Sequence, residues 1–501
     1  MRINNLTLIC LSLLLFSIPV AAREPVALAE VVATGGTVNF QLAVSSYQSE
    51  YKTLPIGVFD SGIGGLTVLA EILKLDSFNN KTHEPGADGR PDFESEKFIY
   101  LGDQANMPYG NYAAEHGEDF LRELVVKDGI FLLGNRYWPN DISESPATDK
   151  PPVKAIVIAC NTATAYGLDD LRDAVKLWNL PVAVIGVVEA GAKGALEAAK
   201  TRSAVAVLAT VGTCRSRGYV RAVEKAFRES NREVPAVVQQ GCLGLAGAVE
   251  GDASYIDRDE GNREAEYRGP SVNNPDAPLD TNLIGFYGFD SDGLLGKAGK
   301  KTGWQLNSVE NYIRYHCLTL AEKYKSTGES RPVGTVILGC THFPYYRDSF
   351  LACFERLRSL AVPDGSYPYR EVLAGKISII DPAVFTATEL FLTLKERKLL
   401  LAESEKPVIQ TDEFYISVPN RNLAEVELTP AGAFTYSYKY GRSPGRVELE
   451  YVRRVPMSAA NMSPAAMAQI KAGMPGVWAR LVEFSRQSPR CETVPDSLRF
   501  N

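Results

Sequence analysis

Short, continuous apolar runs alternate with amphipathic segments along most of residues 55–395. The first run, residues 55–59, leads into a Gly-rich turn at 60–65 and then into a helical spacing of apolar residues over 66–73. Strands buried on both faces read as uninterrupted apolar runs, whereas amphipathic helices repeat every three to four residues. The pattern therefore predicts an α/β fold with parallel strands.

The same order of elements occurs twice. Residues 204–208 form a second apolar run that again leads through a polar turn into a helical pattern. Residues 154–162 and 334–342 are a matched pair, each an apolar strand that ends in Cys and is followed by a residue type that caps helices. Middle strands with Gly-containing turns are expected at 98–110 and 237–244. We therefore predict two similar α/β subdomains related by a pseudo-twofold.

The two matched strands end in Cys160 and Cys340. Ligands of open parallel sheets bind outside the carboxyl ends of the strands. If the two halves face each other, Cys160 and Cys340 approach one cleft from opposite sides. The sequence thus predicts an active site between the subdomains.

The remaining segments divide the chain into parts. We expect a signal peptide at 1–22, an N-terminal linker at 23–54, a first half at 55–190, a second half at 191–395 with a long insertion at 251–332, and a C-terminal α+β extension at 396–501. The C-terminal part of the core can cross back to the first half. Within the extension, alternation predicts strands at 413–418, 434–440 and 447–452, and apolar spacing predicts a helix over 464–484.

The first 22 residues have the pattern of a secretory signal. One positive charge precedes the apolar run 6–20, and small residues at Val20 and Ala22 suit cleavage after Ala22. The alternative is an uncleaved anchor, although the run is shorter than the ~20 residues of a spanning helix. We expect export, to the periplasm, with no membrane attachment after cleavage. If this interpretation is wrong, the protein is cytoplasmic.

Charge and cysteine content narrow the function. The 501 residues carry 53 Lys and Arg against 60 Asp and Glu, a net charge of -7. No basic excess is available to hold a nucleic-acid backbone, so we expect a small molecule as the partner. Eight cysteines are too few for a disulfide scaffold, and each must be interpreted from its surroundings.

Two thiols on opposite sides of a cleft suit proton transfer at a carbon acid. A thiolate is a base and a thiol an acid, and the ordinary thiol pKa of ~8.5 lies near working pH. Each Cys precedes a predicted helix start, where the dipole favours the thiolate. Asp60 and His342 could relay or balance charge beside them. A single Cys at a strand end is usually a buried small hydrophobe, but the matched pair favours chemistry.

Four motifs carry a family resemblance. They are the segments 56–66 with Asp60-Ser61-Gly62, 102–110 with Pro108-Tyr109-Gly110, 159–163 with Cys160-Asn161-Thr162, and 339–344 with Cys340-Thr341-His342. In this order they resemble the signatures of the cofactor-independent glutamate racemases of the aspartate/glutamate racemase family. The resemblance covers about residues 56–250 and 333–395.

The resemblance implies a role for each matching residue. Cys160 and Cys340 would exchange the α-proton, one on each face, with Asp60 and His342 assisting. The substrate-binding residues would be Asp60, Ser61, Tyr109, Gly110, Asn161, Thr162, Thr213, Thr341 and His342. Glu250 matches an acid that assists in some members, although the insertion starts immediately after it. We take Asp103 as structural.

The resemblance also implies an isomerase that interconverts L- and D-glutamate without cofactor or metal. Family members are normally cytosolic and supply D-glutamate for peptidoglycan in cell-wall biogenesis, whereas this chain is predicted to be exported. A homodimer is one assembly that the insertion could create. Cys214 and Cys242 lie near the signature turns; they could form a disulfide or simply pack, and we favour packing.

Three other functions compete with this interpretation. Within the enzyme class, an aspartate or broad-specificity amino-acid racemase fits, because no residue sets the side-chain length. An exported amino-acid binding protein would need the polar turns but not the thiols. A metal hydrolase fits less well, because Cys340 and His342 supply two ligands where a catalytic zinc usually needs three.

Overall fold

The computed structural model describes residues 26–36, 39–200, 202–252, 254–256, 267–288, 305–362 and 364–501. The predicted signal peptide lies outside the described residues. None of the helices within these ranges combines the length and the apolar character needed to cross a bilayer.

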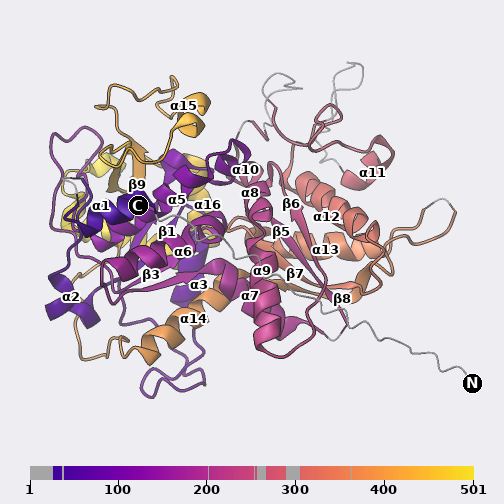
Figure 1. Cartoon of the computed structure of the whole chain (residues 1–501), viewed down its shortest axis with the longest axis horizontal. Coiled ribbons are helices and arrows are strands. Elements are labelled where there is room, and N and C mark those ends of the chain that lie inside the picture. Colours follow the sequence, from indigo (N-terminus) through magenta and orange to yellow (C-terminus); the bar gives the residue numbers. More distant parts are fainter. Residues whose placement is uncertain are drawn as a thin grey trace, which may run out of the picture.

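In the part of the chain that the structure describes, ten strands form two sheets in two adjacent lobes (Figure 1). The first sheet has the order β10-β9-β2-β1-β3-β4 and the second β6-β5-β7-β8. The strands are β1 (Ile56–Asp60), β2 (Phe98–Gly102), β3 (Ala155–Ile158), β4 (Ala183–Gly186), β5 (Ala204–Ala209), β6 (Val237–Gly241), β7 (Val333–Gly339), β8 (Leu373–Ile380), β9 (Glu413–Pro419) and β10 (Val452–Pro456).

The two lobes share one strand order. In the first, the strand before the Gly-rich turn, β1, lies between β2 and β3, and β4 follows β3. In the second, β5 lies between β6 and β7, and β8 follows β7. All of these pairs are parallel. The predicted α/β fold with two related subdomains is confirmed at this level.

Burial on both faces explains the uninterrupted apolar runs. In β1, Val58 and Phe59 are both fully buried but enter two different hydrophobic clusters. Successive strand residues point to opposite faces, so helices must cover the sheet on both sides.

Helices occupy most of the connections between the strands. They are α1 (Ala27–Ala33), α2 (Ser46–Ser49), α3 (Leu66–Lys74), α4 (Gly110–Ala114), α5 (Glu118–Leu133), α6 (Asn161–Leu177), α7 (Val187–Ala198), α8 (Val211–Ser216), α9 (Gly218–Glu229), α10 (Leu245–Glu250), α11 (Ile284–Tyr287), α12 (Val309–Lys325), α13 (Arg347–Arg358), α14 (Pro382–Glu396), α15 (Tyr436–Gly441), α16 (Pro464–Gly473) and α17 (Pro475–Gln487). Short 3-10 helices are Tyr51–Thr53, Gln104–Asn106, Thr281–Leu283, Phe343–Tyr346, Pro489–Cys491 and Asp496–Leu498.

Helix α14 links the end of the second sheet to the first lobe. It begins after β8, where Asp381 caps it by accepting a hydrogen bond from the Ala383 backbone N–H at 2.9 Å. It then packs against α7 and α3, and Figure 1 shows it beside α3 in the first lobe. Residues 382–396 therefore contribute to the core of the first lobe.

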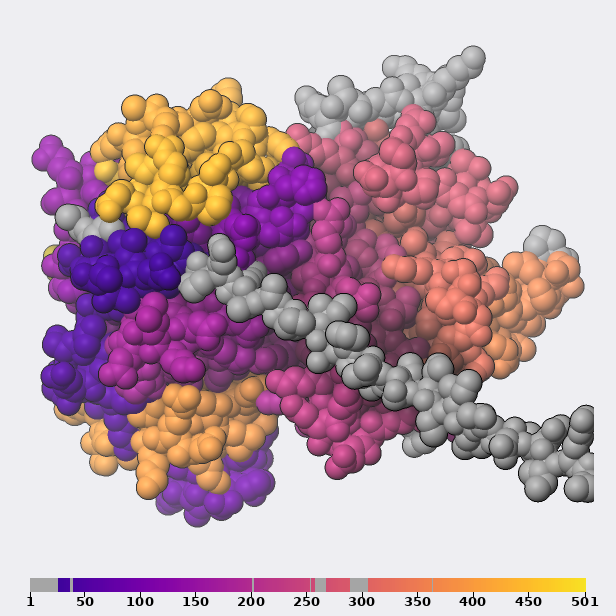
Figure 2. Space-filling model, in the orientation of Figure 1, coloured from indigo at the N-terminus to yellow at the C-terminus, as the bar shows by residue number. Residues whose placement is uncertain are grey.

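The C-terminal extension completes the first sheet. β9 pairs in parallel with β2, and β10 pairs antiparallel with β9. Figure 2 shows the yellow C-terminal atoms gathered over the same lobe as the indigo N-terminal residues. The extension therefore covers the edge of the sheet that β2 would otherwise expose.

Three expectations for the extension were wrong in detail. Residues 436–441 form helix α15 instead of a strand, because Thr435 caps it by accepting from the Tyr438 backbone N–H. Strand β10 begins only at Val452, since residues 447–451 run as a loop. The helix expected over 464–484 is two helices, because Pro475 has no N–H to continue α16 and instead starts α17.

Candidate active site

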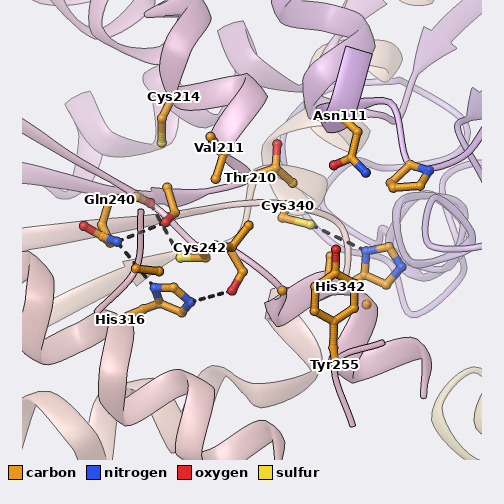
Figure 3. Close-up of a pocket in the computed structure, with 18 of the residues that line it drawn as sticks. Asn111, Thr210, Val211, Cys214, Gln240, Cys242, Tyr255, His316, Cys340 and His342 are labelled. Atoms are coloured by element: carbon orange, nitrogen blue, oxygen red, sulfur yellow. Dashed lines mark hydrogen bonds between the residues drawn. The ribbon is translucent and has the colours of Figure 1, made fainter. Parts of the chain in front are cut away.

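A cavity of about 1080 Å³ lies at the carboxyl ends of strands from both sheets. Of the residues predicted for the site, it is lined by Asp60, Ser61, Tyr109, Gly110, Cys160, Asn161, Thr162, Glu250, Cys340, Thr341 and His342. Figure 3 shows part of this cavity, with Cys340 and His342 beside each other. The fold therefore brings all the predicted site residues except Thr213 to one cavity.

Strand ends and helix starts position the two thiols. Cys160 follows β3 and is the N-cap of α6, where its sulfur accepts a hydrogen bond from the Ala163 backbone N–H at 3.4 Å. Cys340 directly follows β7, the equivalent strand of the second sheet. The thiols thus reach the cavity from different sheets, in equivalent positions of the two lobes.

Cys160 has surroundings that keep it protonated. Its side chain is almost completely buried and donates to the Ser61 hydroxyl, with 3.7 Å between Sγ and Oγ. Burial, together with the nearby Asp60 carboxylate, raises the pKa of the Cys160 thiol far above its usual value. Cys160 is therefore a thiol, ready to donate a proton.

Cys340 has a histidine as its neighbour instead. Its Sγ lies 3.5 Å from His342 Nδ1, and His342 Nε2 lies 2.7 Å from Glu250 Oε1. Burial alone would lower the pKa of His342, but the Glu250 carboxylate and the Cys340 sulfur outweigh it and raise this pKa well above its usual value. An imidazole in this position can accept the thiol proton, giving a thiolate beside an imidazolium.

Asp60 lies at the end of β1, and backbone N–H groups bond to only one of its two carboxylate oxygens. Oδ2 accepts the backbone N–H of Gly65 at 2.8 Å and of Gly62 at 3.4 Å. The buried Oδ1 has no hydrogen-bond partner among the residues that the structure describes. Burial raises the pKa of Asp60, and the charge on His342 opposes this increase. A buried acceptor without a partner at a cavity wall is a site for a ligand's donor.

Three threonine hydroxyls, those of Thr162, Thr210 and Thr213, lie close together between the lobes. Thr162 Oγ1 lies 3.2 Å from Thr210 Oγ1 and 3.0 Å from Thr213 Oγ1. Thr213 is fully buried and does not line the cavity, whereas Thr210 does. Thr210 caps α8 and so lies at the strand end, while Thr213 lies within the helix. Contact of Thr213 with substrate stays a prediction, and Thr210 is the neighbouring hydroxyl residue that lines the cavity.

Asn161 and Tyr109 each use part of their side chain to hold the site together. Asn161 Oδ1 accepts from the Tyr219 hydroxyl at 2.5 Å. The Tyr109 hydroxyl contacts the carboxylates of Asp103 and Asp128, at 2.5 and 2.8 Å. Both aspartates are fully buried, so this hydroxyl is an anchor. The turn at Tyr109 and Gly110 can therefore contact a ligand through its backbone groups.

The cavity also has a second wall that the sequence did not predict. It includes Cys214, Gln240, Cys242, Tyr255 and His316 (Figure 3). His316 bridges Gln240 and the Leu243 carbonyl, and burial lowers its pKa to about 3, which keeps it neutral. Cys214 and Cys242 are both free thiols. Only proximity to the signature turns could have indicated this wall, because its residues come from α8, β6, α12 and the start of the insertion.

No group of three or more His, Cys, Asp or Glu side chains suitable for a metal ion occurs among the residues that the structure describes. The polar lining groups are thiols, hydroxyls, amides and carboxylates together with His342, His316 and Arg215. This donor set suits proton transfer and hydrogen bonding to a small polar ligand.

Comparisons with known proteins show which family the chain resembles. The family model described as Asp/Glu/Hydantoin racemase matches residues 142–254. The glutamate racemase of Staphylococcus epidermidis is 32% identical over 320 residues, which are 64% of this chain and 80% of that protein. The chain belongs to the Asp/Glu racemase family.

Other members of the family match this chain over shorter segments or with lower sequence identity. The glutamate racemase of Oceanobacillus iheyensis is 35% identical over 170 residues, covering 34% of this chain and 46% of the relative. That match spans about half the length of the relative. Among solved structures, glutamate racemase RacE1 of Bacillus anthracis is 23% identical with a TM-score of 0.43, over 72% of this chain and 88% of that one.

Proposed function

We propose that this racemase-family protein interconverts L- and D-glutamate by moving the α-proton between two cysteines, without a cofactor. The observation that carries the proposal is the pair Cys160 and Cys340, which line one cavity from two sheets of the same topology. Their environments differ, since Cys160 is kept protonated while Cys340 lies 3.5 Å from a histidine that can take its proton. One base and one acid are therefore available at the same time.

Protons balance in the proposed step. The Cys340 thiolate removes the hydrogen from Cα of one enantiomer, and the Cys160 thiol delivers its own proton to the opposite face. After turnover Cys340 is a thiol and Cys160 a thiolate. The other enantiomer is converted by the same step in reverse, so the two cysteines exchange roles.

The remaining lining groups supply the contacts that glutamate needs. The unpartnered Oδ1 of Asp60 is an acceptor for the substrate ammonium group. Because Asn161 Oδ1 is occupied by Tyr219, its amide NH2 is left to donate to a carboxylate. The hydroxyls of Thr210 and Thr341 line the same cavity and add further donors. Hydroxyls and amides thus bind the carboxylates without a cluster of Lys or Arg.

Incubation in D2O tests the function directly. The purified protein, supplied with L- or D-glutamate and no pyridoxal phosphate or metal, is expected to produce the other enantiomer with deuterium at Cα. Chiral chromatography and mass spectrometry follow both changes. Unchanged, deuterium-free glutamate that still binds tightly would support the alternative of an exported binding protein and refute the racemase.

The same assay separates glutamate from other amino acids. A cavity of about 1080 Å³ is larger than one amino acid needs, so its volume does not exclude aspartate or a broad range of substrates. We expect the highest kcat/KM with glutamate. A higher value with aspartate would favour an aspartate or broad-specificity racemase and leave the two-cysteine mechanism intact.

The Glu250→Gln variant tests the link between Glu250 and His342. Glu250 raises the pKa of His342, so removing its charge should lower that pKa. The imidazolium is then lost at a lower pH, and we expect the alkaline limb of the kcat/KM profile to move to lower pH by about one unit or more. Glu115→Gln, at the cavity wall but without a bond to His342, is the control. An unmoved limb in Glu250→Gln would contradict the assignment.

We also propose that the protein is exported, as the pattern of residues 1–22 suggests. Its D-glutamate would then arise outside the cytosol, apart from the usual supply of peptidoglycan precursors. N-terminal sequencing of the protein from its native host is expected to begin at Arg23. A sequence that begins at Met1 or Arg2 would refute cleavage.

A further inference from the structure

The turn that carries Tyr109 and Gly110 lies between the cavity and the C-terminal extension. On the extension side, Lys439 Nζ donates to the Met107 carbonyl at 2.6 Å, and the Tyr440 hydroxyl donates to the Pro108 carbonyl at 3.3 Å. Met107, Pro108, Tyr109, Gly110 and Asn111 all line the cavity. The extension therefore contacts the back of a cavity wall.

The Tyr109 hydroxyl belongs to a buried chain of hydrogen bonds. This chain runs through Asp103 and Asp128 to Arg454 of the extension. The Tyr109 hydroxyl has one proton but contacts two carboxylates, so one carboxyl must itself be protonated. Burial and the charge of Asp103 raise the pKa of Asp128 to about 7, so Asp128 can hold this proton near neutral pH. Asp103 also accepts from Asn106 Nδ2 at 2.9 Å.

Arg454 of β10 balances the charge of this chain. Its guanidinium donates to Asp128 Oδ1 at 2.9 Å, with the Arg454 side chain 7% exposed and Asp128 fully buried. The positive charge of Arg454 also acts on Asp103, so one cation of the extension interacts favourably with both buried acids. Without Arg454, the buried acids next to the turn would lose the cation that contacts Asp128 directly, which is strongly unfavourable.

A second arginine of the extension holds the same segment. Arg442 Nη2 donates to Asn106 Oδ1 at 2.7 Å and contacts the Tyr112 hydroxyl at 2.9 Å. Asn106 and Tyr112 are fully buried and lie on either side of the turn. Residues 103–112 are thus fixed at both ends by side chains of the extension.

We propose that the C-terminal extension holds the turn at residues 107–110 in the conformation that binds glutamate, with Arg454 and Arg442 as positioning residues. That the ligand is glutamate rests on the proposed function. That the extension fixes the turn at residues 107–110 does not depend on it. Tyr109 and Gly110 act through backbone contacts, so a displaced turn loses binding in the ground state and the transition state alike. Such a loss raises KM more than it lowers kcat.

Neighbouring arginines of β10 provide a matched pair of variants. Arg454→Met removes the contact with Asp128. Arg453→Met removes an equally buried guanidinium that instead donates to the carbonyls of Asp141 and Ser143 and stacks on Trp138. Both variants truncate a buried arginine of the same strand, but only Arg454 touches the chain that ends at Tyr109.

We expect Arg454→Met to raise KM for glutamate about tenfold or more while kcat changes less than threefold. Hydrogen exchange of peptides over 103–114 should become faster in Arg454→Met and stay unchanged in Arg453→Met. Arg454→Lys, which keeps the charge, should recover part of the KM. Equal effects of Arg453→Met and Arg454→Met on KM and exchange would overturn the proposal.

The exchange measurement also separates the two hypotheses. If the wild type does not racemise glutamate but exchange over 103–114 still depends on Arg454, the proposed function fails and the positioning role stands. If Arg454→Met does not fold, Lys439→Met removes a contact with the turn from a half-buried side chain. Unchanged KM and exchange in a folded Lys439→Met would then count against the proposal.

Discussion

Replacing either Cys160 or Cys340 by alanine is expected to lower kcat for racemisation by about 10³-fold or more. Racemisation needs a base on one face of Cα and an acid on the other, and each variant removes one of them. The single remaining cysteine can still exchange the Cα hydrogen of the one enantiomer whose Cα hydrogen points toward that cysteine. We therefore expect each variant to incorporate deuterium into one enantiomer at most, without inversion, and the two variants to differ in which one.

Cys242→Ala is the matched control for these variants. Cys242 lines the same cavity and is as buried as the two catalytic candidates, and its thiol donates to the Gln240 carbonyl at 3.5 Å. Racemisation by Cys242→Ala should stay within a few fold of wild type. Full activity in Cys160→Ala or in Cys340→Ala would rule out the two-cysteine mechanism, whatever the control shows.

Glu96→Ala is expected to lower the free energy of unfolding by about 3 to 5 kcal/mol. Glu96 forms a completely buried ion pair with Lys154, with 2.7 Å between the charged atoms. Burial raises the pKa of Glu96 and lowers the pKa of Lys154, so each charge depends on the other for compensation. Removing one partner leaves the other charged group buried without it.

Urea unfolding measures this effect, with two comparisons. Glu71→Ala removes the carboxylate of a solvent-exposed pair with Lys74 and should change stability little. The double variant Glu96→Gln, Lys154→Met removes both charges and keeps an acceptor for the Leu401 N–H, so it should be more stable than Glu96→Ala. A loss below about 1 kcal/mol in Glu96→Ala would show that the pair contributes little.

The strands of the racemase core and strand β9 of the extension could be predicted from the sequence, whereas the rest of the extension could not. Strands β1 and β7 are buried on both faces, and burial of that kind leaves an uninterrupted apolar run. Residues 434–440 alternate like a strand, yet 436–441 form α15 because the cap at Thr435 and packing decide the outcome. Local propensity is a weak guide in short segments with several aromatic residues.

The sequence could predict those active-site residues that belong to its motifs. Cys160 and Cys340 lie where their strands end, and the position of the apolar runs is enough to show this. That Glu250 reaches His342 Nε2 at 2.7 Å could not be derived, because α10 is separated from β7 by the insertion. Likewise, the fact that Thr210 lines the cavity, while Thr213 does not, depends on how α8 is oriented.

By itself, the sequence determined the α/β architecture, its duplication and the two thiols at equivalent strand ends. These features are local, since periodicity records which faces are buried and a motif records the residues at the end of a strand. Only the tertiary structure decided that Cys160 is kept protonated by burial and Asp60 while Cys340 is paired with His342 and Glu250. It also decided that Arg454, more than 300 residues from Asp128, completes the chain behind Tyr109. Protonation and long-range pairing depend on distance and desolvation, which arise only when separate segments pack together.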